Sequence, residues 1–298
     1  MAGARTTYLD PAVLARLGSL DLKAKTIVEG FLTGLHRSPY RGFSVEFAEY
    51  RQYIPGDDLQ YMDWKVYARS DRHYVKKFEE ETNLECHLLL DVSASMGYGS
   101  QGVSKMEYGA VLAASLAYLM NRQRDAVGLI TFDDHVISRL PPSARPGHLR
   151  AVTVALERAT IGLRTNVAKP LDDLARAIRK RGLVIVISDL LDDTARVIEG
   201  LKRFHHRGTE VIVFHVMDHD ELQFPFERAA RFRDPETSDE VVAVPSAVRD
   251  DYLAAVGGLT DAYRVGLGGT GVDYHLLDTS QPLELGLLRY LSARGRAS

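Results

Sequence analysis

The sequence predicts an α/β protein with a doubly wound, mostly parallel sheet, and two observations support that prediction. From residue 84 onward, short apolar runs alternate with segments of helical pattern. Two of the runs, LVIVIS and EVIVFHV, are continuously apolar, as is typical of strands covered on both faces. We therefore expect one sheet with helices packed on both sides.

Each predicted strand is an apolar run bounded by charged or turn-forming residues. These runs fall at 86–91, 126–132, 183–189, 210–217 and 273–278. A short edge strand at 136–138 is expected beside the second of them. Helices are expected between and after the strands, at 106–122, 147–160, 170–181, 195–207, 247–263 and 282–294. Pro170 and Pro282 suit the first turn of their helices.

Residues 1–83 differ in character and are predicted to form an N-terminal module, with the α/β domain over 84–298. One or two helices are expected within 10–35. The stretch that follows is rich in Tyr, Phe and Arg and is predicted to be irregular, with β segments. Inside the α/β domain, two polar-apolar runs around a polar turn predict a β-hairpin insertion at 227–245.

Composition narrows the class of protein. The 298 residues carry a net charge of -3, which provides no global basic field for nucleic-acid binding. The single cysteine, Cys86, excludes an internal disulfide framework and is compatible with a reducing compartment. No signal-peptide core and no uncharged apolar stretch of about 18 residues is present, so we expect a cytoplasmic protein without a membrane span.

The clearest chemical signal is an apolar run that ends in Asp91-Val92-Ser93-Ala94-Ser95. Small oxygen-bearing side chains at a spacing of two, where a strand stops, suit a hard divalent cation such as Mg²⁺, Mn²⁺ or Ca²⁺. Asp189 also closes an apolar run, and ligands bind beyond the carboxyl ends of parallel strands, so Asp91 and Asp189 should share one rim of the sheet. The alternative is a strand-to-helix turn whose Asp and Ser cap backbone amides.

Thr165, which precedes a predicted helix, extends the pattern. In this order and spacing the chain resembles a von Willebrand factor A domain, whose metal-ion-dependent adhesion site takes Asp-x-Ser-x-Ser, a Thr and an Asp from three loops. The resemblance implies that Ser93, Ser95 and Thr165 hold the metal directly or through water. It implies that Asp91 and Asp189 act through water and hold the serines in place. An Asp or Glu of a partner protein would then complete the metal shell.

The N-terminal stretch contains a distinctive set of residues, namely Glu46-Phe47, Arg51, Tyr53, Pro55-Gly56-Asp57-Asp58, Asp63-Trp64 and Ala68-Arg69. This set closely resembles the bacterial family catalogued as domain of unknown function fifty-eight. Members commonly carry a von Willebrand A domain and often occur beside ATPases of the MoxR class of the AAA+ superfamily. The resemblance therefore implies a non-enzymatic adaptor or chaperone-like protein, whose partners are a MoxR-type ATPase, a client protein or both.

An enzymatic alternative is a Mg²⁺-dependent aspartyl phosphatase of the haloacid-dehalogenase type. Asp91 would be its nucleophile, and Asp189 with Asp192 and Asp193 would bind the metal. Such enzymes carry a second Asp two residues after the nucleophile as general acid. Here that position is Ser93, whose hydroxyl cannot protonate a leaving group near neutral pH in the same way.

Overall fold

A computed structural model describes residues 18–37, 50–52, 74–76, 84–162, 166–178, 180–237 and 239–297. Its contacts form two compact units. One holds helix α2 (Leu20–Arg37) together with the chain from residue 84 onward, and the other holds the antiparallel pair β1 (Tyr50–Gln52) and β2 (Tyr74–Lys76). Most of the Tyr- and Arg-rich stretch lies outside the described residues, so its irregular β structure stays a prediction.

The larger unit is built on a six-stranded sheet of order β10-β7-β6-β3-β4-β5. Its strands are β3 (Glu85–Asp91), β4 (Ala126–Phe132), β5 (Val136–Ser143), β6 (Gly182–Ser188), β7 (Glu210–Met217) and β10 (Val272–Asp278). Every neighbouring pair is parallel except β4 with β5, which is antiparallel. The predicted doubly wound, mostly parallel sheet is therefore confirmed, and the edge strand continues to Ser143, beyond the predicted end at 138.

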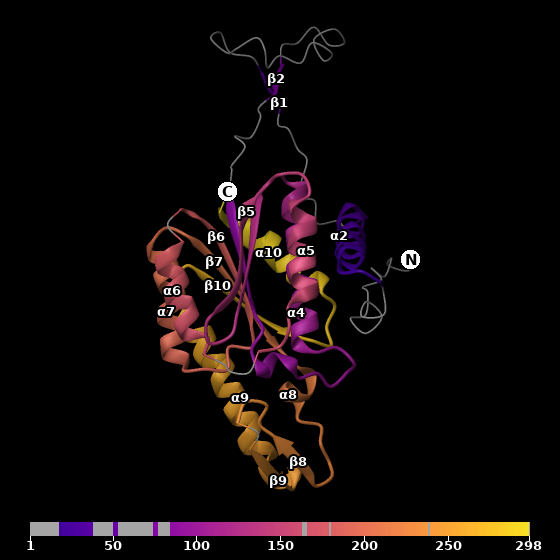
Figure 1. Ribbon diagram of the computed structural model, residues 1–298, viewed down its shortest axis with the longest axis vertical. Coiled ribbons are helices and arrows are strands. Elements are labelled where there is room, and N and C mark those ends of the chain that lie inside the picture. The colour runs from indigo at the N-terminus through magenta and orange to yellow at the C-terminus, as the bar shows by residue number, and fades with distance from the viewer. Residues whose placement is uncertain are drawn as a thin grey trace. The chain divides into compact units, whose positions relative to one another are not determined.

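Helices cover both faces of this sheet, as Figure 1 shows. One face carries α2, α4 (Lys105–Arg122), α5 (His148–Arg158) and α10 (Glu284–Ala297). The other carries α6 (Ala168–Ala177), α7 (Thr194–His206) and α9 (Pro245–Leu267). Successive residues of β3 point to opposite faces, so Leu88 and Leu90 belong to the first core and Leu89 to the second. Both layers therefore fix β3 at the centre of the unit.

Helix α2 is part of the α/β unit although the sequence analysis assigned it to the N-terminal module. Ala24, Ile27 and Val28 are fully buried in the core that also contains α4. Their spacing places three apolar side chains on one face of the helix, which α4 covers. The structure divides the chain at residue 84, as predicted, and also between residues 37 and 38, so that α2 falls in the α/β unit.

The remaining differences concern short elements and element ends. The 3-10 helix η2 (Ala94–Gly97) and helix α8 (His219–Gln223) are not predicted from sequence, because neither is long enough to show a periodic pattern. Helix α6 begins at Ala168, so Pro170 is its third residue and not its first. Helix α9 begins earlier than predicted, with Pro245 in its first turn.

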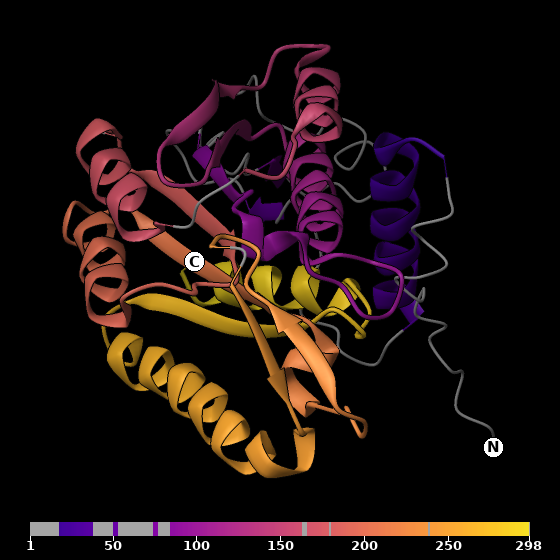
Figure 2. The same ribbon diagram turned by 60° about the horizontal axis from the view of Figure 1, so that its bottom comes forward.

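The segment predicted as a hairpin insertion contains β8 (Ala230–Arg233) and β9 (Glu240–Ala243), which pair antiparallel. Figure 2 shows this hairpin beside α8 and the start of α9. The Arg249 guanidinium of α9 donates a hydrogen bond of 2.6 Å to the carbonyl of Phe226, just before the hairpin. The insertion is therefore tied to the helix that follows it.

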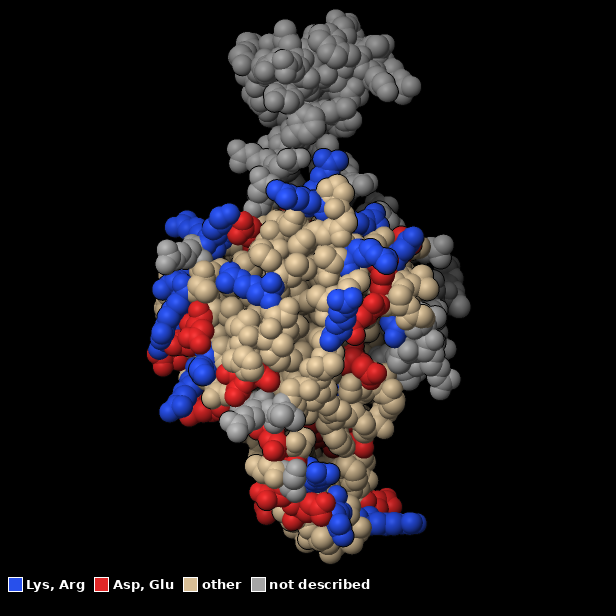
Figure 3. All heavy atoms as spheres, viewed as in Figure 1, with Lys and Arg blue, Asp and Glu red and all other residues tan. Residues whose placement is uncertain are grey.

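The surface of the larger unit carries mixed charge. On the face shown in Figure 3, Lys and Arg side chains are interspersed with Asp and Glu and form no continuous basic stripe. Among the described helices, none has the length and apolar character needed to cross a bilayer.

Candidate functional site

Aspartates mark the carboxyl ends of all five parallel strands of the sheet. Their positions, one for each of β3, β4, β6, β7 and β10, are Asp91, Asp133, Asp189, Asp218 and Asp278. Carboxyl ends of parallel strands meet at one edge of a sheet, so these carboxylates gather on a single rim. Asp91 and Asp189 lie there together, because β3 and β6 are paired neighbours, as the sequence predicts.

The loop after β3 presents its oxygen atoms in a compact turn. Asp91 is fully buried and accepts a hydrogen bond of 2.9 Å from the backbone N–H of Ser93. The hydroxyl oxygens of Ser93 and Ser95 lie 3.1 Å apart. The other carboxylate oxygen of Asp91 accepts a 2.6 Å hydrogen bond from the hydroxyl of Ser188, the last residue of β6. The turn is therefore fixed both within its own loop and to the neighbouring strand.

Asp189 supplies the second buried carboxylate, and Lys105 pairs with it. The Lys105 ammonium, at the start of α4, lies 2.8 Å from a carboxylate oxygen of Asp189 and 2.7 Å from one of Glu221 in α8. The Lys105 and Asp189 side chains are wholly buried, and that of Glu221 is 16% exposed. One ammonium thus links the β6 loop to α8.

Burial and like charge dominate the electrostatics of the rim. Burial and, second to it, the nearby Asp189 carboxylate raise the pKa of Asp91 to about 7, against the hydrogen bonds from Ser188 and Ser93, which lower it. Burial alone would lower the pKa of Lys105, but the carboxylates of Asp189 and Glu221 outweigh burial and raise that pKa. Two carboxylates, those of Asp189 and Glu221, share the one ammonium, and Asp91 is a further buried carboxyl group near Asp189, so the rim favours an added cation.

The Thr165 position cannot be compared with these residues, because 163–165 lie outside the described chain. The described chain before it ends at Gly162, whose N–H donates a 2.6 Å hydrogen bond to the carbonyl of Val92. The side chain of Ile161 lies against Gly97, which belongs to η2. The loop that leads toward Thr165 is thus attached to the Asp91–Ser95 turn, and the role of Thr165 itself stays a prediction.

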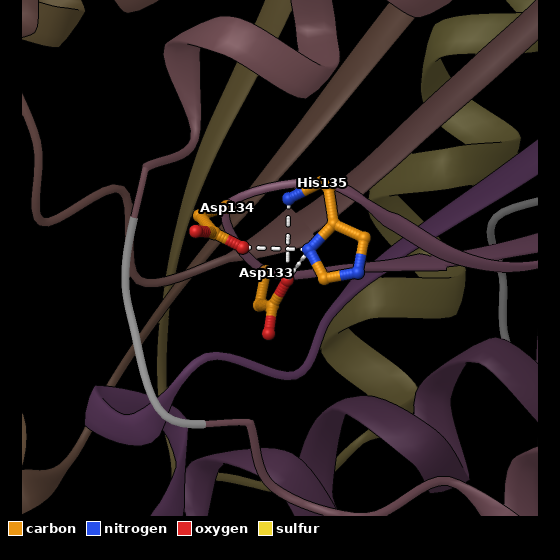
Figure 4. Close-up of side chains that lie close together, drawn as sticks. All are labelled: Asp133, Asp134 and His135. Carbon is orange, nitrogen blue, oxygen red and sulfur yellow. Dashed lines mark hydrogen bonds and ion pairs between the residues drawn. The ribbon is translucent and has the colours of Figure 1, made fainter.

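A second acidic cluster lies in the β4–β5 turn, where Asp133, Asp134 and His135 bring their ligand atoms within 4.8 Å of one another (Figure 4). The His135 ring nitrogen lies 2.6 Å from an oxygen of Asp134 and 3.0 Å from one of Asp133. The backbone N–H of His135 also donates to Asp133. These contacts close the turn on itself, and we assign the cluster a structural role.

The acids required by the phosphatase alternative are engaged elsewhere. Asp192 accepts a hydrogen bond of 3.0 Å from the backbone N–H of Ala168 at the start of α6. Asp193 is the N-cap of α7 and accepts from the N–H of Arg196. Both carboxylates thus stabilise helix starts.

Three residues of the rim escaped the sequence analysis. Ser188 carried a usable signal, because a polar residue ends the otherwise apolar strand β6 beside Asp189. Lys105 and Glu221 carried none, since single charged residues at a helix start normally face solvent. Only the packing of α4 and α8 over the rim brings the two side chains to Asp189.

The donor set fits the hard divalent cation expected from the sequence. All groups that Asp91, Ser93, Ser95 and Asp189 direct to the rim are oxygens, which Mg²⁺ and Ca²⁺ prefer over nitrogen or sulfur. Asp189 already has one cationic partner, the Lys105 ammonium, which also donates to Glu221. A cation at the rim would be held by the serine hydroxyls and the two aspartates.

Comparison with known proteins gives one family. The family described as "Protein of unknown function DUF58" matches residues 49–258 of the chain. Curated relatives include uncharacterized protein Rv1480 of Mycobacterium tuberculosis and uncharacterized protein Mb1516 of Mycobacterium bovis. Each is 29% identical over an alignment 298 residues long, which covers 97% of this chain and 92% of the relative.

Solved structures show partial likeness. The protein BatB of Bacteroides thetaiotaomicron has a TM-score of 0.49 and 19% identity, over 72% of this chain and 100% of its own. An aerotolerance-related membrane protein of Bacteroides fragilis has a TM-score of 0.49 and 21% identity, over 70% of this chain and 98% of its own. The SpRpn10 VWA domain has a TM-score of 0.37 and 15% identity, over 68% of this chain and 93% of its own.

Proposed function

The chain belongs to the family described as protein of unknown function DUF58, and from that premise we propose that it is a metal-dependent protein-binding module. In this proposal the rim holds a divalent cation, with Mg²⁺ as the preferred ion. Its ligands, direct or through water, are Ser93, Ser95, Thr165, Asp91 and Asp189. Neutral hydroxyl ligands leave the ion much of its charge, so an Asp or Glu of a partner protein enters the open coordination position. The protein acts by binding and not by catalysis.

One observation carries the proposal: two hydroxyls 3.1 Å apart lie beside two fully buried carboxylates from neighbouring strands. Burial of charged carboxylates costs free energy unless a cation or hydrogen bonds balance them. Fixing Asp91 between Ser93 and Ser188 prepares the hydroxyls before any ion binds. Such preparation supports binding chemistry.

Titration calorimetry with Mg²⁺ and Mn²⁺ tests the metal. The protein should bind one ion, and the Ser93→Ala/Ser95→Ala double variant should lose that binding with its fold intact by circular dichroism. Ser115→Ala is the matched control, because Ser115 is also fully buried but bonds only to Val111 within α4. Equal binding by the double variant and the wild type would overturn the metal assignment.

The partner is tested separately. We propose a MoxR-type AAA+ ATPase, a client protein or both, on the family resemblance alone. Affinity capture from native cells should recover the partner in Mg²⁺ and lose it in excess EDTA or with the double variant. Capture that survives EDTA unchanged would contradict a metal-bridged contact, whatever protein is recovered.

A further inference from the structure

The three loops that surround the candidate metal rim each expose a large apolar side chain. Tyr98 follows the Asp91–Ser95 turn, Ile161 lies on the loop that leads toward Thr165, and Leu191 follows Asp189. Their side chains are 40%, 42% and 38% exposed, respectively. Apolar residues gathered in this way around a site mark a surface that another molecule covers.

A cavity of about 570 Å³ opens beside this rim. Ser95 and Leu191 line it on the metal side, and Phe224, Phe226, Phe232 and Tyr252 line it on the side of the insertion. The aromatic rings of this wall already pack against one another without an occupant. The ring centroids of Phe224 and Tyr252 lie 4.5 Å apart, and those of Phe226 and Phe232 lie 5.4 Å apart. The bond from Arg249 to Phe226 fixes the wall to α9.

The lining of the cavity is mostly apolar. The aromatic rings, Ala94 and Pro235 offer apolar contact. Asp220, Glu221 and Arg233 also contribute to the lining, so its charged residues are of both signs, and Glu221 is paired with Lys105 at 2.7 Å. This lining favours an apolar occupant over an ionic one.

The geometry points to a binding site for a large apolar side chain of the partner, aliphatic or aromatic, next to the carboxylate that the metal captures. The inference rests on the proposed function, because Ser95 belongs to both the metal rim and the cavity. A peptide segment whose Asp or Glu reaches Ser95 passes over the mouth of the cavity. The partner signal is thus an acidic residue with an apolar neighbour, and not an isolated acid.

Small probes can test the two halves of this signal independently. Straight-chain carboxylic acids with a terminal phenyl group, in a series of lengths, are titrated in Mg²⁺ and in EDTA and followed by protein-observed NMR. The matched probes are the same acids without the ring, the phenyl alcohols and the phenylalkylamines. At the best length, the phenyl acid should bind at least about tenfold more tightly than the plain acid.

Two variants locate the effect. Leu191→Ser should remove most of the advantage of the phenyl acid and leave binding of the plain acid unchanged. Val265→Ser is the matched control, because Val265 is an exposed apolar residue of α9 that does not line the cavity. It should change neither affinity.

Other outcomes separate the two proposals. If phenyl and plain acids bind equally in Mg²⁺, the apolar site is overturned and the metal capture stands. If phenyl alcohols bind as tightly as phenyl acids, with or without Mg²⁺, the apolar cavity stands and capture of a carboxylate by the metal is overturned. If the phenylalkylamines bind most tightly, the apolar occupant is overturned in favour of a cationic one.

Discussion

Asp91 is the side chain whose ionisation should control the stability of the metal-free protein. Its pKa in the folded state is about 7, against an ordinary value of 3.8, so between those values the folded state binds more protons than the unfolded state. This group therefore lowers the free energy of unfolding as pH rises from about 4 to about 7, and its effect is constant above that range.

We predict that Asp91→Asn stabilises the metal-free protein at pH 8. Removing a buried charge beside Asp189 should raise the free energy of unfolding by on the order of 1–3 kcal/mol in EDTA. Urea unfolding at pH 8 and pH 5 measures the change, which should shrink at the lower pH. Asp173→Asn, at an exposed position of α6, is the control and should have little effect. An equal gain at both pH values would contradict the assigned cause.

A second prediction at the scale of single residues concerns the buried ion pairs of Lys105 with Asp189 and Glu221. Removing one partner of a buried ion pair leaves the other charge uncompensated, so Lys105→Met should lower the free energy of unfolding by about 3–5 kcal/mol in EDTA. Mg²⁺ should then raise the melting temperature of the variant more than that of the wild type, because the ion takes over part of the role of the ammonium. Differential scanning calorimetry in both conditions measures this.

The matched control is Lys180→Met. The Lys180 ammonium also lies 2.6 Å from a carboxylate, that of Glu85, but its side chain is 76% exposed. Exposed pairs contribute below about 1 kcal/mol, so this variant should behave like the wild type. A Lys105→Met protein with unchanged stability would show that Asp189 and Glu221 need no buried cation.

At the scale of elements, two glycines with different surroundings give opposite predictions. Gly257 lies inside α9, where an added Cβ would meet no atom within 4 Å. Gly257→Ala should therefore stabilise the protein by about 0.5–1 kcal/mol through helix propensity. Gly128 of β4 faces the backbone of β5, where an added Cβ would lie 2.7 Å from the carbonyl oxygen of Leu140.

Gly128→Ala should accordingly lower the free energy of unfolding by about 1–3 kcal/mol, because the edge strand must move. Chemical denaturation of the two variants beside the wild type checks both signs. Destabilisation by Gly257→Ala would show that α9 makes a close contact at this position.

Elements with a strong pattern were predictable from the sequence, and short or convergent ones were not. The continuous apolar runs of β6 and β7 indicated buried parallel strands, and their terminal residues indicated the rim. Helix α8 has only five residues, too few to show a helical periodicity in the sequence. A capping box between Asp218 and Glu221 stabilises its start. The contact of Glu221 with Lys105 joins residues 116 positions apart, which no local pattern encodes.

At the scale of the whole molecule, the α/β unit is assembled from two separate stretches of chain. Helix α2 buries Ile27 against the layer that contains α4, although the second compact unit is inserted between them in sequence. The stability of the unit therefore depends on residues far upstream of its first sheet strand.

Ile27→Ala should lower the free energy of unfolding of this unit by about 2–5 kcal/mol, as truncation of a fully buried side chain does. Leu22→Ala, in the same helix but 50% exposed, should change it by much less. Hydrogen exchange of the α4 amides reports on the unit itself. If α4 exchange is the same in both variants, α2 does not stabilise the sheet layer.

The separation of α2 from α4 also matters while the protein is being synthesised. Residues 38–104, which are 67 residues, must be translated after α2 before its covering helix begins. At 5–20 residues per second this takes roughly 3–13 s. During that time the apolar face of α2, with Ala24, Ile27 and Val28, has no α4 to pack against. The earliest described segment of the chain thus depends on later segments for its tertiary contacts, and slow codons in the intervening stretch would lengthen that delay.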